Sequence, residues 1–149
     1  SVLGVSTGAV AGLATITPAS GYVGPLGAIF IGIAAGVVCF IFATSIKRKL
    51  GYDDTLDAFG VHGVGGTLGT MMTAVFAART LGGYTPNGLG IASQMGAQLL
   101  GIAVTLAWSG VSAFVILKVL DRAIGLRVTR PQEQEGLDLS EHDERGYDF

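Results

Sequence analysis

Four long runs of apolar residues divide the chain, and short polar or glycine-rich links separate them. A helix needs about 20 apolar residues to cross the hydrocarbon core of a membrane. The fourth run is longer than the core is thick, so its helix is expected to tilt or to project into the cytoplasm. The pattern therefore predicts an all-α membrane protein with four transmembrane helices, at residues 2–19, 25–46, 59–78 and 93–120.

Charged residues lie almost entirely outside these runs. They make up 13% of the chain, whereas a soluble domain carries about 25%. The first charge is Lys47, none occurs between Arg79 and Lys118, and eight of the eleven acidic residues lie from Asp121 onward. A soluble bundle of buried helices is disfavoured, because residues 1–46 carry no formal charge. We expect a transmembrane region at residues 1–124 and a polar tail at 125–149, for which a solvated, partly disordered end is the alternative.

Basic residues predict the orientation of the spans. Lys47, Arg48 and Lys49 follow the second run, and three arginines follow the fourth. The positive-inside rule places both ends in the cytoplasm, and the two assignments agree because two crossings separate them. The sequence thus predicts a multi-pass protein with a cytoplasmic C-terminus, and external links at residues 18–22 and 81–88.

Composition excludes several other classes of protein. A net charge of −2 without a basic patch in the body argues against nucleic acid as a partner. Cys39 is the only cysteine, so an internal disulfide and a zinc cluster are excluded. We expect neither a cofactor nor a metal. The chain begins at Ser1 inside an apolar run, which favours a sequence truncated at its N-terminus.

Glycines recur at four-residue spacing in three of the runs. Such spacing lets helix backbones approach closely in a membrane, where no hydrophobic drive holds helices together. The spacing fits a tight bundle around a narrow pathway, and it also fits ordinary helix packing. The pairs and triplets are Gly4, Gly8 and Gly12, then Gly32 and Gly36, then Gly65 and Gly69.

The start of the third run contains the candidate chemistry. Asp57 precedes the run and is expected to be the N-cap of its helix. His62 is the only ionisable side chain between Asp57 and Arg79, and ionisable groups inside a membrane usually face the bundle interior or a pathway. Gly60 and Gly63 are expected to leave the imidazole accessible and to let another backbone approach.

Two interpretations of His62 remain open on spacing alone. A neutral imidazole has one donor and one acceptor, so it could hydrogen-bond a small polar solute or relay a proton. It could instead bond a neighbouring helix for packing. Metal binding is less favoured, since His142 in the tail is the only other histidine.

Residues 53–70 resemble the signature of the ammonium transporter (Amt/Mep/Rh) family. Residues 6–19 resemble the eighth helix of that family, and residues 108–111 lie where its long last helix would be. Residues 125–128 and 135–142 resemble its cytoplasmic tail. The resemblance covers essentially the whole chain in order, and the bacterial, Amt-like branch fits best.

The resemblance implies an eleven-helix fold, assembled as a homotrimer with one pore per subunit in the inner (plasma) membrane. The four spans would be helices eight to eleven, which makes this the C-terminal part. His62 would be the second of two pore histidines, and Asp57, Phe59, Gly60 and Gly63 would support it. The tail would respond to a PII-class signalling protein. The partner histidine, the outer cation site and the phenylalanine gate belong to earlier helices and cannot be placed here.

The resemblance also implies the function. Ammonium would lose its proton near the entrance, and ammonia would cross a hydrophobic pore past the histidines. An ammonium sensor of the same fold, signalling through its tail, is the alternative. An intramembrane enzyme using His62 is disfavoured, because no spacing couples a serine to that histidine.

Overall fold

The computed structural model describes residues 2–85 and 88–146. Every regular element in these ranges is a helix. By the contacts between Cα atoms the chain divides into two units, Ser1–Val104 and Thr105–Phe149. Each unit is described by itself.

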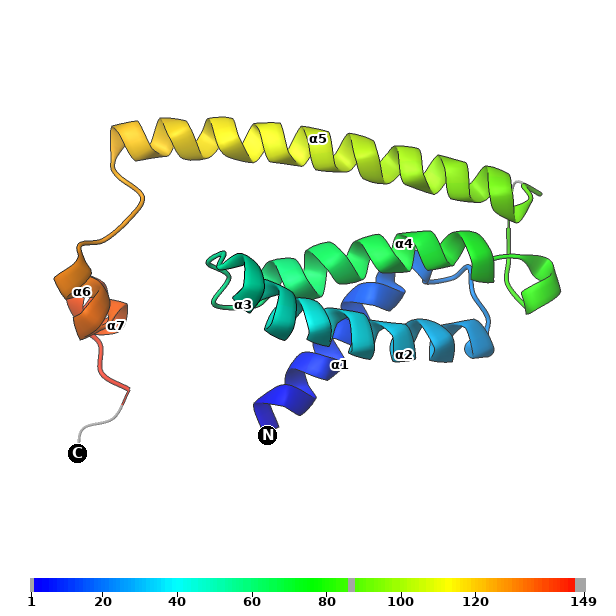
Figure 1. The fold of residues 1–149 in the computed structure, drawn as a ribbon, viewed down its shortest axis with the longest axis horizontal. Helices are drawn as coiled ribbons and strands as arrows, with labels where there is room; N and C mark the ends of the chain where they lie inside the picture. Colours follow the sequence, from blue (N-terminus) through cyan, green and yellow to red (C-terminus); the bar gives the residue numbers. More distant parts are fainter. Residues whose placement is uncertain (1, 86–87, 147–149) are drawn as a thin grey trace. The chain divides into compact units, whose positions relative to one another are not determined.

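Eleven helical elements occupy the described residues (Figure 1). The elements η1 and η4 are 3-10 helices, and η2 and η3 are wider π-helical turns. The π-turn η2 joins α2 to α3 without interruption, and η3 leads directly into α4. In chain order they are α1 (Val2–Ile16), η1 (Thr17–Ala19), α2 (Pro25–Ile41), η2 (Phe42–Ile46), α3 (Lys47–Leu50), η3 (Phe59–Gly63), α4 (Val64–Phe76), η4 (Arg79–Leu81), α5 (Ile91–Ala123), α6 (Arg130–Glu135) and α7 (Leu137–His142).

Helices occupy each of the four apolar runs, so the prediction of an all-α protein is confirmed. Two of them are long and apolar enough to cross a membrane: the continuous helix Pro25–Leu50, of 26 residues, and Ile91–Ala123, of 33 residues. The other two, α1 and α4, have 15 and 13 residues and are extended by η1 and η3. Four membrane crossings therefore remain a prediction.

Three helices form the core of the first unit. Helices α2 and α4 run antiparallel, and α1 crosses both (Figure 1). The side chains at their meeting points are small, and Ala11, Cys39 and Val61 form a buried cluster against which Ala14 packs. Small side chains allow close backbone contact, which replaces the hydrophobic drive that is missing between helices in lipid.

The glycine pattern predicts close packing correctly for one pair only. A side chain on Gly69 would collide with the backbone carbonyl of Thr15, and one on Gly65 would meet the Thr15 hydroxyl. By contrast, the space beside Gly8, Gly12, Gly32 and Gly36 is open within the described part of the chain. The tight crossing is therefore that of α1 with α4.

The long helix α5 has no buried residue along its described length. Large apolar side chains are exposed on it, among them Trp108 at 75% of its surface. The expected tail at 125–149 contains two short helices, α6 and α7, in its described part, and residues 147–149 lie outside the described residues. Thr129 and Gln132 form a capping box at the start of α6, and Gln132 Nε2 donates to Glu141 Oε1 of α7 at 3.0 Å.

Replacing Gly69 by alanine tests the tight crossing. The added methyl group has no room beside Thr15, so α1 and α4 must separate. Overpacking of this kind costs about 1–3 kcal/mol. Thermal unfolding of the complete protein in detergent measures the loss. The control is Gly66→Ala, where the added methyl group meets open space. Equal unfolding midpoints for the two variants would contradict the close contact.

Candidate functional site

His62 lies in the π-turn η3, on the exposed side of the helical bundle. Its neighbours Gly60 and Val61 are buried, and they face α2 and the core. A side chain on Gly60 would lie 3.1 Å from the backbone nitrogen of Ala43, so the expected approach of another backbone at this glycine is present. The imidazole therefore points away from the packed core of the three helices. π-turns within α-helices occur frequently at functional sites.

Phe59 and Gly63 lie on either side of this histidine along η3. A side chain on Gly63 would lie 3.1 Å from Cδ2 of Phe59, so the Phe59 ring covers that glycine. The same ring meets Tyr52 edge to face, with 5.7 Å between the ring centroids. The two residues thus pack the exposed start of the helix next to His62.

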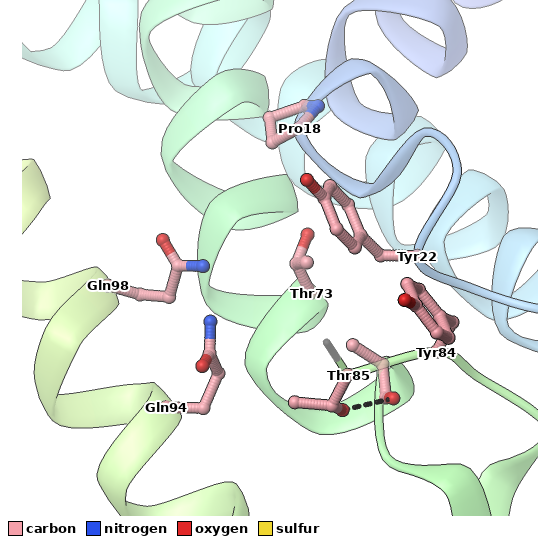
Figure 2. A pocket seen from close by; sticks show the side chains of 8 residues that line it. Pro18, Tyr22, Thr73, Tyr84, Thr85, Gln94 and Gln98 are labelled. Atoms are coloured by element: carbon pink, nitrogen blue, oxygen red, sulfur yellow. Dashed lines mark hydrogen bonds between the residues drawn. The ribbon is translucent and has the colours of Figure 1, made fainter. Parts of the chain in front are cut away.

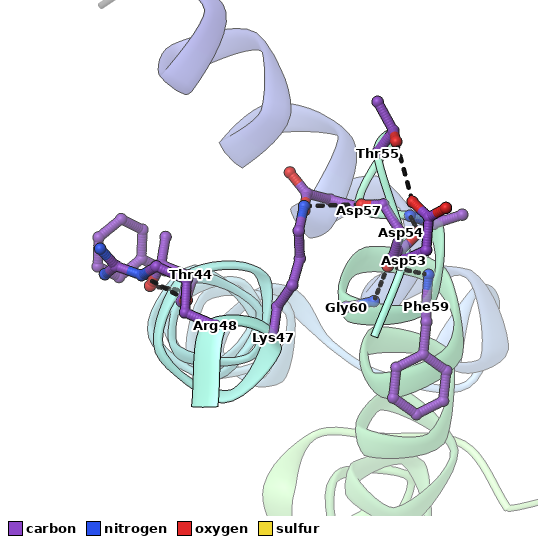
Figure 3. Close-up of polar contacts among 11 residues, drawn as sticks. Thr44, Lys47, Arg48, Asp53, Asp54, Thr55, Asp57, Phe59 and Gly60 are labelled. Atoms are coloured by element: carbon purple, nitrogen blue, oxygen red, sulfur yellow. Dashed lines mark hydrogen bonds and ion pairs between the residues drawn. The ribbon is translucent and has the colours of Figure 1, made fainter. Parts of the chain in front are cut away.

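Asp54 caps the helix that carries His62. Its Oδ1 accepts from the backbone N–H of Ala58 at 2.8 Å, and its Oδ2 accepts from Phe59 at 3.0 Å and Gly60 at 3.4 Å (Figure 3). These N–H groups have no partner within the helix, since they belong to its first turn. The carboxylate also complements the positive end of the helix dipole.

The prediction that Asp57 is the N-cap is wrong. An N-cap residue has extended backbone geometry, whereas Asp57 has a φ of 54° in the left-handed region. The N–H of Asp57 donates to the Asp54 carbonyl at 3.1 Å, and this turn brings the Asp54 carboxylate over the start of the helix. Three aspartates precede the run, and the sequence does not show which one the turn selects.

Asp57 instead forms an ion pair with Lys47 from the preceding helix. The distance from Lys47 Nζ to Asp57 Oδ1 is 2.6 Å, and the same ammonium donates to the Asp54 carbonyl at 2.7 Å (Figure 3). The two side chains are 26% and 30% exposed. Partly exposed pairs contribute about 0–1 kcal/mol, so the main effect is to tie the end of α2–α3 to the start of α4.

Cavities at the two ends of the three-helix bundle are lined by described residues of the first unit. One, of about 380 Å³, is bordered by small residues of α1 and α2 and reaches Asp57 and Val61 at the His62 end of the bundle. The other, of about 200 Å³, lies at the opposite ends of the helices and is polar. Figure 2 shows the amides of Gln94 and Gln98 pointing toward Thr73 in this cavity. Its walls include no charged side chain.

No group of three metal-ligating side chains occurs among the residues that the structure describes. The groups that sequence reasoning missed are Asp54 and Lys47. The sequence shows charged residues next to an apolar run. It does not show that Asp54 caps the helix or that Lys47 pairs with Asp57, because both depend on the turn at residues 51–57. The predicted pore residue His62 and its predicted supports Phe59, Gly60 and Gly63 all lie in η3, and their roles stay predictions.

Comparisons with known proteins cover nearly the whole chain. Residues 1–147 match the profile of the Ammonium Transporter Family. The chain is similar to ammonium transporters of Bacillus subtilis (45% identity over 98% of this chain and 37% of the relative) and Aquifex aeolicus (46%, over 99% and 35%). It is also similar to ammonium transporter Amt1 of Archaeoglobus fulgidus (41%, over 97% and 37%). The chain thus spans little more than a third of the length of these relatives.

Removing the Asp54 carboxylate tests the cap. We expect Asp54→Ala to destabilise the complete protein by about 0.5–2 kcal/mol, the usual cost of losing an N-cap. The unfolding midpoint in detergent measures this change. Asp53→Ala is the control, since Asp53 accepts from the Thr55 hydroxyl at 3.3 Å and lies one residue earlier. A larger loss from Asp53→Ala than from Asp54→Ala would refute the assignment of the cap.

Proposed function

This chain belongs to the ammonium transporter family, and we propose that it supplies the His62 side of a pore through which ammonia crosses the membrane. Membership of the family makes it part of a membrane protein. The observation that carries the proposal is the imidazole in η3, which is exposed on a helix whose other face is packed against α1 and α2. A polar ring on an apolar helix needs a polar neighbour in a membrane.

The physical chemistry of the solute supports this role. Stripping water from an ammonium ion without replacement ligands is very costly, whereas neutral ammonia loses its water at a small cost. Loss of the proton near the entrance therefore lets ammonia enter a dry, narrow path. A neutral imidazole offers one donor and one acceptor, so it can hold ammonia by a hydrogen bond without binding it tightly. The proton is handled separately from the ammonia.

We assign the four helical segments to helices eight to eleven of the family fold. The charged segment at residues 47–57 comprises α3 and most of the loop that leads to η3, and the antiparallel course of α2 and α4 puts it at one end of the bundle. The uncharged link at residues 20–24 and the loop after η4 meet at the other end, where Tyr84 N–H donates to the Tyr22 carbonyl at 2.7 Å. The positive-inside rule then makes the charged end cytoplasmic and directs residues 125–149 into the cell.

The complete pore needs parts that this chain does not contain. We assign the partner histidine and the outer cation site to other helices of the subunit, since the chain spans about a third of the length of its relatives. We further propose that the subunit assembles as a homotrimer in the plasma membrane and that a PII-class protein binds the tail. The mixed charges and the polar contacts of α6 and α7 suit such a protein partner.

Replacing His62 by alanine in the complete transporter tests the pore assignment. A hydrogen bond to the solute contributes about 1 kcal/mol, so we expect ammonium uptake or selectivity against potassium to fall about five- to tenfold. Uptake into vesicles of labelled substrate and competition by potassium measure both quantities. His142→Ala, at the other histidine of the chain, is the control. Unchanged uptake and unchanged selectivity in the His62 variant would remove this residue from the mechanism.

A further inference from the structure

We propose that Cys39 and Thr15 are positioning residues for His62, which they orient through the peptide bond that joins Val61 to His62. The proposal rests on the proposed function, because orientation matters only if the imidazole meets the solute. Neither residue touches the pore side of the helix. Both act from the buried side of η3.

The Cys39 thiol contacts the carbonyl group next to His62. Its Sγ lies 3.9 Å from the Val61 carbonyl oxygen and donates a weak hydrogen bond to it. Cys39 and Val61 are 2% and 4% exposed, so water does not compete for this bond. The Val61 carbonyl and the His62 nitrogen share one planar peptide unit. Holding that carbonyl toward α2 therefore fixes one of the two peptide planes that flank the His62 Cα, and so helps to set the orientation of that residue.

Thr15 of α1 reaches the same place in the core as the thiol. Its hydroxyl donates to the Ala11 carbonyl at 2.8 Å, and the residue is fully buried. Gly65 lies against both groups: a side chain there would come 2.7 Å from the Thr15 hydroxyl and 3.1 Å from the Cys39 sulfur. The polar groups of Thr15 from α1 and Cys39 from α2 thus both lie against Gly65 of α4, and Cys39 bonds Val61 of η3; we name this group of residues the Thr15–Cys39–Val61 junction.

The π-turn makes such an anchor useful. A π-helical turn holds one more residue than an α-helical turn and is rare in proteins, so the direction of its side chains depends on outside support. Asp54 supports η3 at its start, Gly60 packs against Ala43 on one side, and the junction holds its middle. The junction is the support bonded directly to the peptide unit of His62.

The test compares small changes of side chain in the complete transporter. Cys39→Ala removes the donor, Cys39→Ser retains one, and Thr15→Val removes the hydroxyl at nearly constant volume. Thr73→Val is the matched control: Thr73 is also buried and also donates to the carbonyl four residues earlier, at 2.7 Å, but away from His62. Each variant is also made in the His62→Ala background. The readouts are the selectivity for ammonium over methylammonium, the pH profile of uptake, and the unfolding midpoint.

We expect Cys39→Ala and Thr15→Val to change selectivity about three- to tenfold and to shift the pH profile, as coupled neighbours do. Cys39→Ser should recover most of the change, and Thr73→Val should leave selectivity unaltered. In the His62→Ala background the junction variants should have no further effect on selectivity. If Cys39→Ala does not fold, Thr15→Val and Cys39→Ser, each with and without His62→Ala, are compared in its place.

Two results would overturn the proposal and separate it from the function. If His62→Ala changes transport but the junction variants match Thr73→Val, or act equally without His62, the positioning role is wrong and the pore role stands. If His62→Ala has no effect on transport, the pore role fails and the positioning role fails with it.

Discussion

At Gly69, α4 comes so close to the Thr15 carbonyl of α1 that no side chain fits between the two backbones. This contact sets the crossing of the two helices, and the position of every other residue on α4 follows from it. In lipid the hydrophobic effect does not hold helices together, so close backbone packing must supply the attraction. With α1 fixed on this side, Gly65 and Val61 face inward and His62 faces outward.

The first backbone N–H groups of this helix and the carboxylate of Asp57 have partners within the protein. The carboxylate of Asp54 accepts from the first N–H groups, and the ammonium of Lys47 neutralises Asp57. Unpaired backbone groups are very costly in an apolar environment, so the charged loop is what allows an apolar helix to begin beside it. Apart from Arg79, the charged residues of the first unit lie at this end of the bundle, and His62 is the ionisable residue of the apolar run that follows.

The exposed apolar surface of the chain fits its place in a membrane protein family. No residue along α5 is buried within the described structure, and apolar side chains such as Trp108 are exposed. Contiguous apolar surface of this kind is typical of sites that contact lipid or another protein. The chain matches its relatives over nearly its own whole length but over little more than a third of theirs. The open face that includes His62 is therefore where we place the pore.

The sequence by itself determined the helices, the family and the candidate histidine. An uncharged apolar run of about 20 residues forms a helix when it crosses a membrane, because its backbone groups must then bond one another. A lone ionisable residue within such a run can be seen in the sequence without the fold. Tertiary structure alone decided which aspartate caps the helix, which glycines pack, and which way His62 points. These depend on contacts between residues far apart in the sequence, such as Thr15 with Gly69 and Cys39 with Val61. The spacing of residues within one segment does not predict these contacts.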